Sequence, residues 1–174
     1  FSYDIVRPRQ FVQHYTAKSK SQYFLANDHK LNLVLSYQSN KRKEFDRALL
    51  SPRPELDLNI STTMLDLNYE SSSTSRNQFS LGVNAMLQEN IWTGSRFFIP
   101  NFRSQNIALY ATKSIHLQDW MFDGGIRYDT RKLNTFRNQS DAISTKERNF
   151  GNASGTFGAT YKLTPNLKWL LNFY

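Results

Sequence analysis

The stretch "WMFDGGIRYDTRKL", residues 120–133, decides the fold class because its side chains alternate strictly between apolar and polar. Trp120, Ile126 and Tyr128 fall on one parity, whereas Arg127 and Asp129 fall on the other. Successive side chains of a strand point to opposite faces, so this stretch predicts a strand with one apolar and one charged face. What the apolar face contacts, a protein core or lipid, is the next question.

The composition does not favour a conventional aliphatic core. Hydrophobic residues make up 39% of the 174-residue chain and the mean hydropathy is -0.60, yet aromatic residues reach 14%. The length predicts a single domain. The chain has no cysteine, which excludes disulfides and thiolate metal sites.

The same alternation recurs along the chain and predicts about eight consecutive antiparallel strands, with no helical period in any stretch. A slip of phase near residues 62–64 predicts a β-bulge there. All five prolines lie in connections or before the first strand, as a sheet requires. The expected strands are 11–25, 31–38, 56–70, 79–88, 107–117, 120–133, 153–163 and 167–173.

The connections alternate in length. Those after the first, third, fifth and seventh strands are short or compact, whereas those after the second, fourth and sixth are long. Long loops at one end and short turns at the other are typical of outer-membrane β-barrels. The sequence therefore favours a transmembrane barrel over a soluble β-sandwich or a water-soluble barrel, which the alternation alone leaves open.

Aromatic side chains on the less polar faces form two levels, as at the two interfaces of a membrane barrel. The level near the short turns comprises Tyr23, Tyr69, Phe79, Trp120, Tyr161 and Trp169. The level toward the long loops comprises Tyr15, Tyr37, Tyr128 and Phe173.

The opposite faces are too polar for a second packed sheet, so we expect them to line a hydrated lumen. Side chains expected to point toward lipid are Leu65, Leu81, Val83, Ile126 and Leu171. Side chains expected to point toward the lumen are Asp66, Asn84, Asp123 and Arg127. In this topology the strands pair sequentially, and the first does not pair with the eighth.

Several segments resemble successive barrel strands of TonB-dependent receptors, most closely those of Bacteroidetes-like bacteria. They are "LNLVLSYQSNKRKEFD", "PELDLNISTTMLDLNYE" and "FFIPNFRSQNIALYATKSIHLQDWMFDGGIRYDTRKL". Within the last, "IPNF" followed by "GGIRYDTR" is similar to the family's "IPNY…AGLRYD.R" pattern. The final "NLKWLLNFY" is similar to the family strand that precedes an Arg-Ala-Pro box, which this chain does not contain. The resemblance covers most of the chain.

The resemblance implies an outer-membrane receptor with a plug domain, a barrel of twenty-two strands and a box that contacts TonB. Residues 1–174 are then expected to be part of a single barrel domain, without the plug. The implied function is TonB-energised uptake of a scarce nutrient, such as an iron or other metal chelate, with no enzymatic activity and no cofactor. The implied partners are outer-membrane lipid, lipopolysaccharide, the chelate and, through parts of the receptor outside this chain, the TonB complex.

Two alternatives from other classes stay open at this point. One is a stand-alone eight-stranded outer-membrane barrel with a structural or adhesion role. The other is a soluble basic β-protein that binds nucleic acid or glycan, which the net charge of +8 and the basic segment "NKRKEFDR" would suit. Nucleic acid is the less favoured partner because that segment has a single aromatic, Phe45, and is interrupted by acids.

Chemistry-bearing residues do not form a catalytic or metal-binding pattern. The three histidines are scattered without metal-ligand spacing. Cations near the long loops are expected instead to contact lipopolysaccharide phosphates on the outer leaflet, the alternative being a solvated rim that keeps the loops apart. These cations are Lys41, Arg42, Lys43, Arg131 and Lys132.

Two long connections combine charges with aromatics, "KRKEFDRALLSPRP" and "IWTGSRFFIPNFR". Stacking and charge-assisted hydrogen bonds suit a large, flat, anionic chelate. Residues 97–99 are expected mainly to fix the connection against its neighbours. Ligand binding is therefore assigned to Trp92, Arg96 and Arg103.

Overall fold

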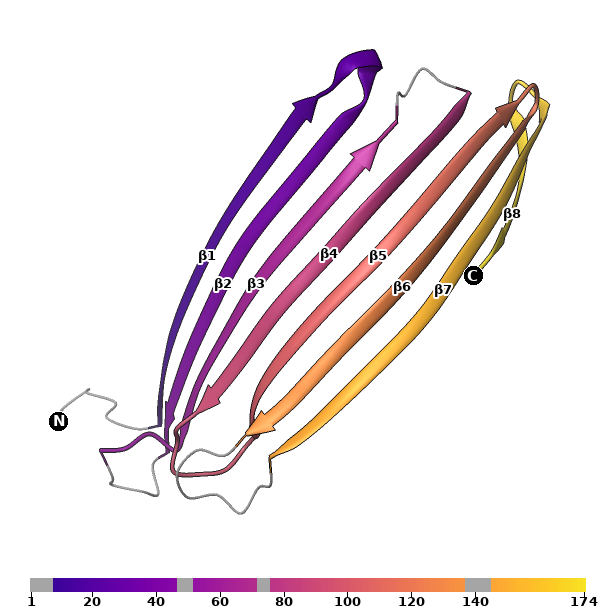
Figure 1. Cartoon of the computed structure of the whole chain (residues 1–174). Helices are drawn as coiled ribbons and strands as arrows, with labels where there is room; N and C mark the ends of the chain where they lie inside the picture. Colours follow the sequence, from indigo (N-terminus) through magenta and orange to yellow (C-terminus); the bar gives the residue numbers. More distant parts are fainter. Residues whose placement is uncertain (1–7, 47–51, 72–75, 137–144) are drawn as a thin grey trace.

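The computed structural model describes residues 8–46, 52–71, 76–136 and 145–174. Its strands lie side by side in one antiparallel sheet in the order of the chain (Figure 1). The strands are β1 (Arg9–Phe24), β2 (Lys30–Phe45), β3 (Leu56–Glu70), β4 (Asn77–Trp92), β5 (Asn101–Leu117), β6 (Trp120–Phe136), β7 (Lys146–Thr164) and β8 (Leu167–Phe173), with one 3-10 turn at Ala26–Asp28. The predicted all-β meander is confirmed. Among these residues no helix is long and apolar enough to cross a membrane.

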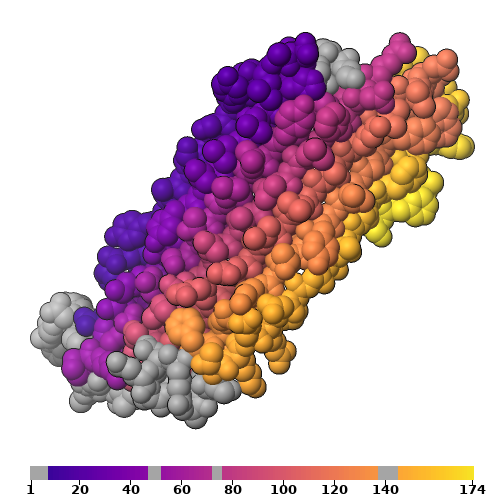
Figure 2. All heavy atoms as spheres, in the orientation of Figure 1, coloured from indigo at the N-terminus to yellow at the C-terminus, as the bar shows by residue number. Residues whose placement is uncertain are grey.

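The sheet is a single open layer whose two edges are β1 and β8 (Figures 1 and 2). Within the described strands, β1 pairs with β2 and β8 pairs with β7, so the first and last strands do not join. The expected sequential pairing is confirmed, and these eight strands do not close a barrel by themselves. Each edge strand leaves one side of its backbone outside the ladder.

The strand register places the apolar side chains on one face of the sheet and the polar side chains on the other, because directly opposed residues of neighbouring strands share a face. Leu67 opposes Val83, which opposes Leu109, which in turn opposes Tyr128. We call this apolar side the outer face and the side that carries Arg127 the inner face. The residues expected on each side of the sheet lie on these two faces, as predicted.

The outer face exposes large apolar side chains along its whole width. Ile126 is 70% exposed, Trp169 66% and Leu171 57%. A soluble monomer rarely exposes a continuous apolar surface larger than a few hundred Å². This face therefore requires an apolar environment, which a lipid bilayer provides.

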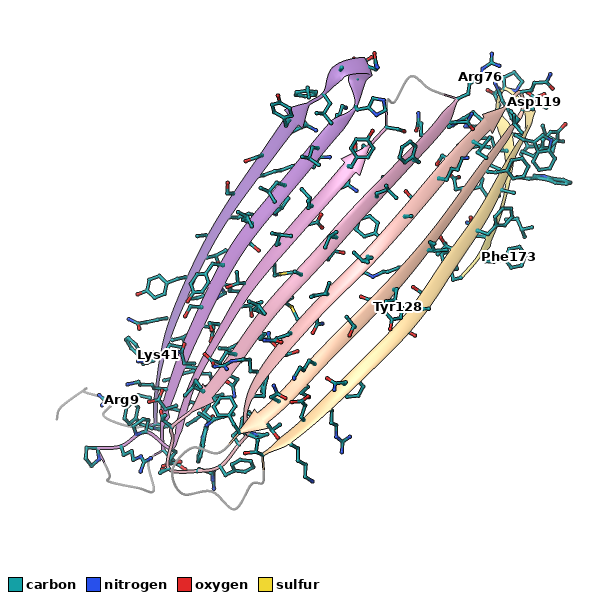
Figure 3. All side chains as sticks on the ribbon, viewed as in Figure 1. Arg9, Lys41, Arg76, Asp119, Tyr128 and Phe173 are labelled. Atoms are coloured by element: carbon teal, nitrogen blue, oxygen red, sulfur yellow. The ribbon has the colours of Figure 1, made fainter. Side chains whose placement is uncertain are left out.

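Aromatic rings cluster on the outer face at the short-turn end. The Trp120 ring centroid lies 4.5 Å from that of Tyr161 and 5.5 Å from that of Phe122. Tyr128 lies eight residues from Trp120 along β6 and well away from the turn (Figure 3). Eight residues rise ~26 Å along a strand, or ~20 Å along the membrane normal at a tilt of about 40°, close to the apolar band of membrane barrels.

One aromatic lies elsewhere than expected. Phe173 opposes Phe157 in the middle of β7, and it is nearer the short-turn end than Tyr128 is (Figure 3). The reason is that β8 extends only from Leu167 to Phe173 after the turn. Phe173 therefore does not belong to the level near the long connections.

The predicted bulge near residues 62–64 is wrong, because β3 pairs with both β2 and β4 there without a register shift. The apolar pattern changes phase for another reason. Toward the long connections the apolar side chains of β3 are on the inner face, where Leu58 opposes Trp92 and both are buried. The register irregularity lies instead between Lys162 and Thr164.

Several strands extend beyond their predicted ends into segments where both faces are polar. Alternation disappears there, but the backbone ladder continues, and oppositely charged side chains pair between strands on the outer face. Lys43 lies 3.8 Å from Asp57, Lys132 lies 2.9 Å from Glu147, and Arg103 pairs with Glu89. The long connections are consequently shorter than predicted, and Lys41 to Lys43 belong to β2.

Substitution of Val83 by Arg, in the full-length protein that contains this chain, is expected to destabilise the fold by roughly 2–4 kcal/mol, the cost of a cation near the bilayer midplane. The measurement is reversible urea unfolding in lipid vesicles. Met86→Arg is the matched control, because Met86 lies in the same strand and lines an inner cavity with Asp66 and Asp129. Equal costs for the two variants would show that Val83 does not face lipid.

Candidate functional site

The connection between β4 and β5, residues 93–100, is held against the segment that leads into β3. Thr93 N–H donates to the Asp57 carbonyl at 2.9 Å, and Arg96 N–H donates to the Glu55 carbonyl at 3.0 Å. The backbone pairing of β3 with β4 thus continues past the end of both strands. It gives this connection a fixed position at the long-connection end of the inner face.

Gly94 allows this close approach. A Cβ atom at position 94 would lie 2.2 Å from the Glu55 carbonyl oxygen and 2.8 Å from the Asp57 nitrogen, both of them backbone atoms. No side chain fits between the two segments without moving one of them. The glycine in "WTGS" is therefore required by packing against residues 55–57.

Trp92 lies beneath the connection and is 6% exposed. Its ring meets Phe97 edge-on, with centroids 5.6 Å apart, and its backbone N–H donates to Asn101 Oδ1 at 2.5 Å. Asn90, two residues before Trp92 in β4, is fully buried and donates from Nδ2 to the Pro100 carbonyl at 3.3 Å. These contacts fix both ends of the connection, and residue 97 supports it as the sequence predicts.

Arg96 lines a cavity of about 590 Å³ on the inner face, between the connection and the ends of β1, β2 and β3. The walls combine charged and apolar side chains, including Arg42, Glu44, Glu55 and Phe98. Small-molecule sites have ~300–1,000 Å³. The volume and the mixed lining make this the candidate ligand site.

Arg103 lies on the other face of the sheet. It opposes Glu89, to which it donates from Nε at 3.2 Å, and its guanidinium lies 6.0 Å from the centre of the Phe136 ring. The structure therefore does not bring Trp92, Arg96 and Arg103 together. One is buried under the connection, one lines the cavity and one is on the outer face, and a role in ligand binding stays a prediction for each.

The five cations expected to contact lipid phosphates also divide between the faces. Lys41, Lys43 and Lys132 are on the outer face, above the apolar band. Arg42 is on the inner face and pairs with Glu44, and Arg131 is on the same side and donates to Ser104 Oγ at 3.1 Å. Figure 3 shows Lys41 near the long-connection end, in line with Arg9.

Midway along the inner face, Arg127 is the centre of a polar network. It donates to both carboxylate oxygens of Asp129 at 2.8 and 2.7 Å and to Asn84 Oδ1 at 2.8 Å. Asn84 donates in turn to Asp66 at 2.6 Å. Asp123, which is on the same face, is not part of this network and accepts a short hydrogen bond from Ser114.

This network borders a cavity of about 580 Å³ that Lys18 and Asn106 also line. The sequence places Asp66, Asn84 and Arg127 on the lumen side but does not connect them. Only the register, which aligns Asp66 with Asn84, shows the contact. Within the described residues no group of three or more His, Asp or Glu side chains could hold a metal ion.

Tyr110 couples three strands on the same face. Its ring crosses β4 at Gly82, where a Cβ atom would lie 2.0 Å from the ring. Its hydroxyl then accepts a hydrogen bond from Asn68 Nδ2 of β3 at 2.9 Å. Asn68, Gly82 and Tyr110 occupy one row of the ladder.

Comparison with known proteins gives one family and several solved structures. The family described as "TonB dependent receptor-like, beta-barrel" matches residues 2–173. No curated protein matches the sequence. The iron transporter FrpB from Neisseria meningitidis, F3-3 variant, is similar with a TM-score of 0.75 and 13% identity, over 94% of this chain and 27% of that chain.

Two further structures have the same fold. The apoprotein form of the FrpB F5-1 variant from Neisseria meningitidis has a TM-score of 0.74 and 14% identity, over 94% of this chain and 28% of that chain. The unliganded ferric citrate transporter FecA has a TM-score of 0.68 and 15% identity, over 95% of this chain and 27% of that chain. The chain thus spans less than a third of the length of these transporters.

Substitution of Gly94 by Ala is expected to destabilise the folded protein by about 1–3 kcal/mol, because the added methyl group overlaps the Glu55 backbone. Gly124→Ala is the matched control, since its nearest contact, the Thr156 carbonyl oxygen, is 3.8 Å away. Urea unfolding of both variants in lipid vesicles makes the comparison. Equal stability of the two variants would contradict the close packing of residues 93–96 against 54–57.

Proposed function

Because this chain belongs to the β-barrel family of TonB-dependent receptors, we propose that it forms part of the wall of an outer-membrane transporter that is energised through TonB. The transporter imports a scarce nutrient, such as an iron or other metal chelate. FrpB and FecA, whose fold the chain shares, are an iron transporter and a ferric citrate transporter. The chain itself contributes structure and ligand contacts rather than catalysis.

The observation that carries this proposal is the separation of the two faces over the whole meander. Apolar side chains such as Ile126 and Leu171 cover the outer face, while Arg127, Asp129 and Asn84 form hydrogen bonds on the inner face. A lipid-facing exterior with a hydrated interior is the design of transport barrels. A soluble binding protein would bury one of these faces in a core.

The free edges of β1 and β8 pair, in this proposal, with further strands of the same receptor. A barrel of the family has about twenty-two strands, of which the chain supplies eight. Since edge strands with unpaired backbone groups are not tolerated in lipid, the remaining strands are needed to close the wall. The plug and the segment that contacts TonB belong to parts of the receptor outside this chain.

The alternating connections support one orientation in the membrane. The short turns at Ala26–Asp28 and at 118–119 then face the periplasm, and residues 52–55 and 93–100 face the outside. Lys41, Lys43 and Lys132 then lie at the level of the outer leaflet, on the face that meets lipid. We propose that these three contact lipopolysaccharide phosphates, whereas Arg42 and Arg131 face the interior.

Uptake of radiolabelled iron tests the function. Iron equilibrated with spent culture medium presents whichever chelators the cells encounter. Cells with the full-length receptor are expected to accumulate iron in an energy-dependent manner, and both receptor deletion and an uncoupler should reduce it. Accumulation that is unchanged by deletion of the receptor would contradict iron uptake, and uptake that resists the uncoupler would contradict energisation through TonB.

Combined substitution of Trp92, Arg96 and Arg103 by Ala is expected to weaken iron uptake per folded receptor, with the amount of folded receptor measured separately because loss of the buried Trp92 ring lowers it. The single variant Arg96→Ala should cause most of the loss, because Arg96 lines the 590 Å³ cavity while Arg103 is on the outer face. Arg76→Ala, at the short-turn end, is the control (Figure 3). Normal uptake by the triple variant would leave residues 93–100 with a structural role alone.

A further inference from the structure

The cavity beside residues 93–100 contains a buried acid whose hydrogen bonding is incomplete. Glu55 lines the cavity and is 8% exposed. Its carboxylate oxygen Oε1 is buried and accepts no hydrogen bond from any side chain or backbone group that the structure describes. Its backbone is fixed, since Glu55 N–H donates to the Glu44 carbonyl at 2.9 Å and its own carbonyl accepts from Arg96.

A buried carboxylate oxygen without a donor is costly, because its lost hydration is not replaced. A hydrogen-bond donor from a bound molecule would remove that cost. A positively charged donor does so best, since a charge-assisted hydrogen bond is about twice as strong as a neutral one. Glu55 therefore indicates a ligand with a cationic N–H group.

Arg96 is a cation in the same cavity that lacks an anionic partner among the described side chains. Arg96 lines the same cavity and forms no ion pair with the side chains that the structure describes, whereas Arg42 is already paired with Glu44. Arg9 is also engaged, with its guanidinium 4.6 Å from the centre of the Phe45 ring. Arg96 is thus the cavity cation that is available to a carboxylate, for which the guanidinium geometry is suited.

The cavity wall also has an apolar part, beside polar side chains such as Gln10 and Asp46. Leu56, Leu58 and Phe98 all line the cavity, and Leu58 is 7% exposed. We propose that the cavity binds an organic zwitterion, with its cationic group on Glu55, its carboxylate on Arg96 and an apolar body against Leu56, Leu58 and Phe98. This inference goes beyond the proposed uptake, because it concerns binding to the receptor without TonB or transport.

The first test compares matched probes on the purified full-length receptor in detergent by isothermal titration. The probes are the tripeptide Ala-Phe-Ala with free ends, its N-acetylated form and its C-terminally amidated form. The free tripeptide is expected to bind about tenfold more tightly than either capped form, since each cap removes one charge-assisted contact. Equal affinity of the three probes, or no binding of the free tripeptide, would overturn the proposal.

Two substitutions assign the contacts. Glu55→Gln should weaken the free and the amidated tripeptide about tenfold but leave the N-acetylated form unchanged, because that form lacks the cation. Arg96→Gln should weaken the free and the N-acetylated tripeptide but leave the amidated form unchanged. Arg76→Gln at the short-turn end is the control, with no expected effect (Figure 3).

Each variant is first checked for folding by its heat-modifiable migration on gels. A variant that does not fold removes one assignment, and the probe comparison on the unaltered receptor still decides the proposal. An equal loss for all three probes in a folded variant would contradict the assignment of that side chain to one end of the ligand. Iron uptake that fails while zwitterion binding persists would overturn the proposed transport function and not this site.

Discussion

The hydrogen bonding of the backbone is the constraint on which the rest of this structure depends. Because the outer face presents apolar side chains to lipid, the N–H and C=O groups between them have no water to bond and need partners within the ladder. The strands from β1 to β7 meet that need with an unbroken register, and the shift between Lys162 and Thr164 lies beside the last turn. The same requirement leaves the edges of β1 and β8 dependent on further strands.

Polar order on the inner face follows from that register. The ladder aligns Asp66 with Asn84, and Arg127 reaches Asn84 from two strands away. The Arg127 and Asp129 side chains are 40% and 41% exposed, so their ion pair contributes little to stability. Its effect is to orient the guanidinium and the carboxylates along the cavity wall, where they present fixed charges to whatever occupies the interior.

Much of the fold could be predicted from sequence, because period-two alternation is a local signal. The parity of Ile126 and Arg127 determines the face of every residue in β6, and neighbouring strands repeat it. The prediction of a bulge near residues 62–64 was wrong. The apolar side chains of β3 change face there because Leu58 packs against Trp92 on the inner face, and in the sequence this change looks like a shift of register. The sequence of one protein does not indicate which face of the sheet is buried in the parts of the strands that extend beyond the membrane.

The candidate site was less predictable, since it depends on how connections pack. The faces of Trp92 and Arg103 depend on where β4 ends and β5 begins, and the polar extensions of these strands hide both points. The separation of Arg42 from Lys41 and Lys43 could have been found by continuing the alternation of β2. The buried position of Glu55 could not, because it depends on how two connections that are distant in sequence pack against each other.

The ring of Tyr110 over Gly82 has a consequence for how the sheet assembles. If a strand slips by one residue, its two faces are exchanged, and its polar side chains then point into lipid at a high cost in free energy. A slip by two residues keeps every side chain on its own face and has no such cost. It would, however, place Ser80 or Asn84 instead of Gly82 beneath the Tyr110 ring. Neither leaves room for the ring, and the hydrogen bond to Asn68 would be lost. Gly82 therefore favours the correct register of three strands over registers shifted by two residues, which the hydrophobic pattern alone does not exclude.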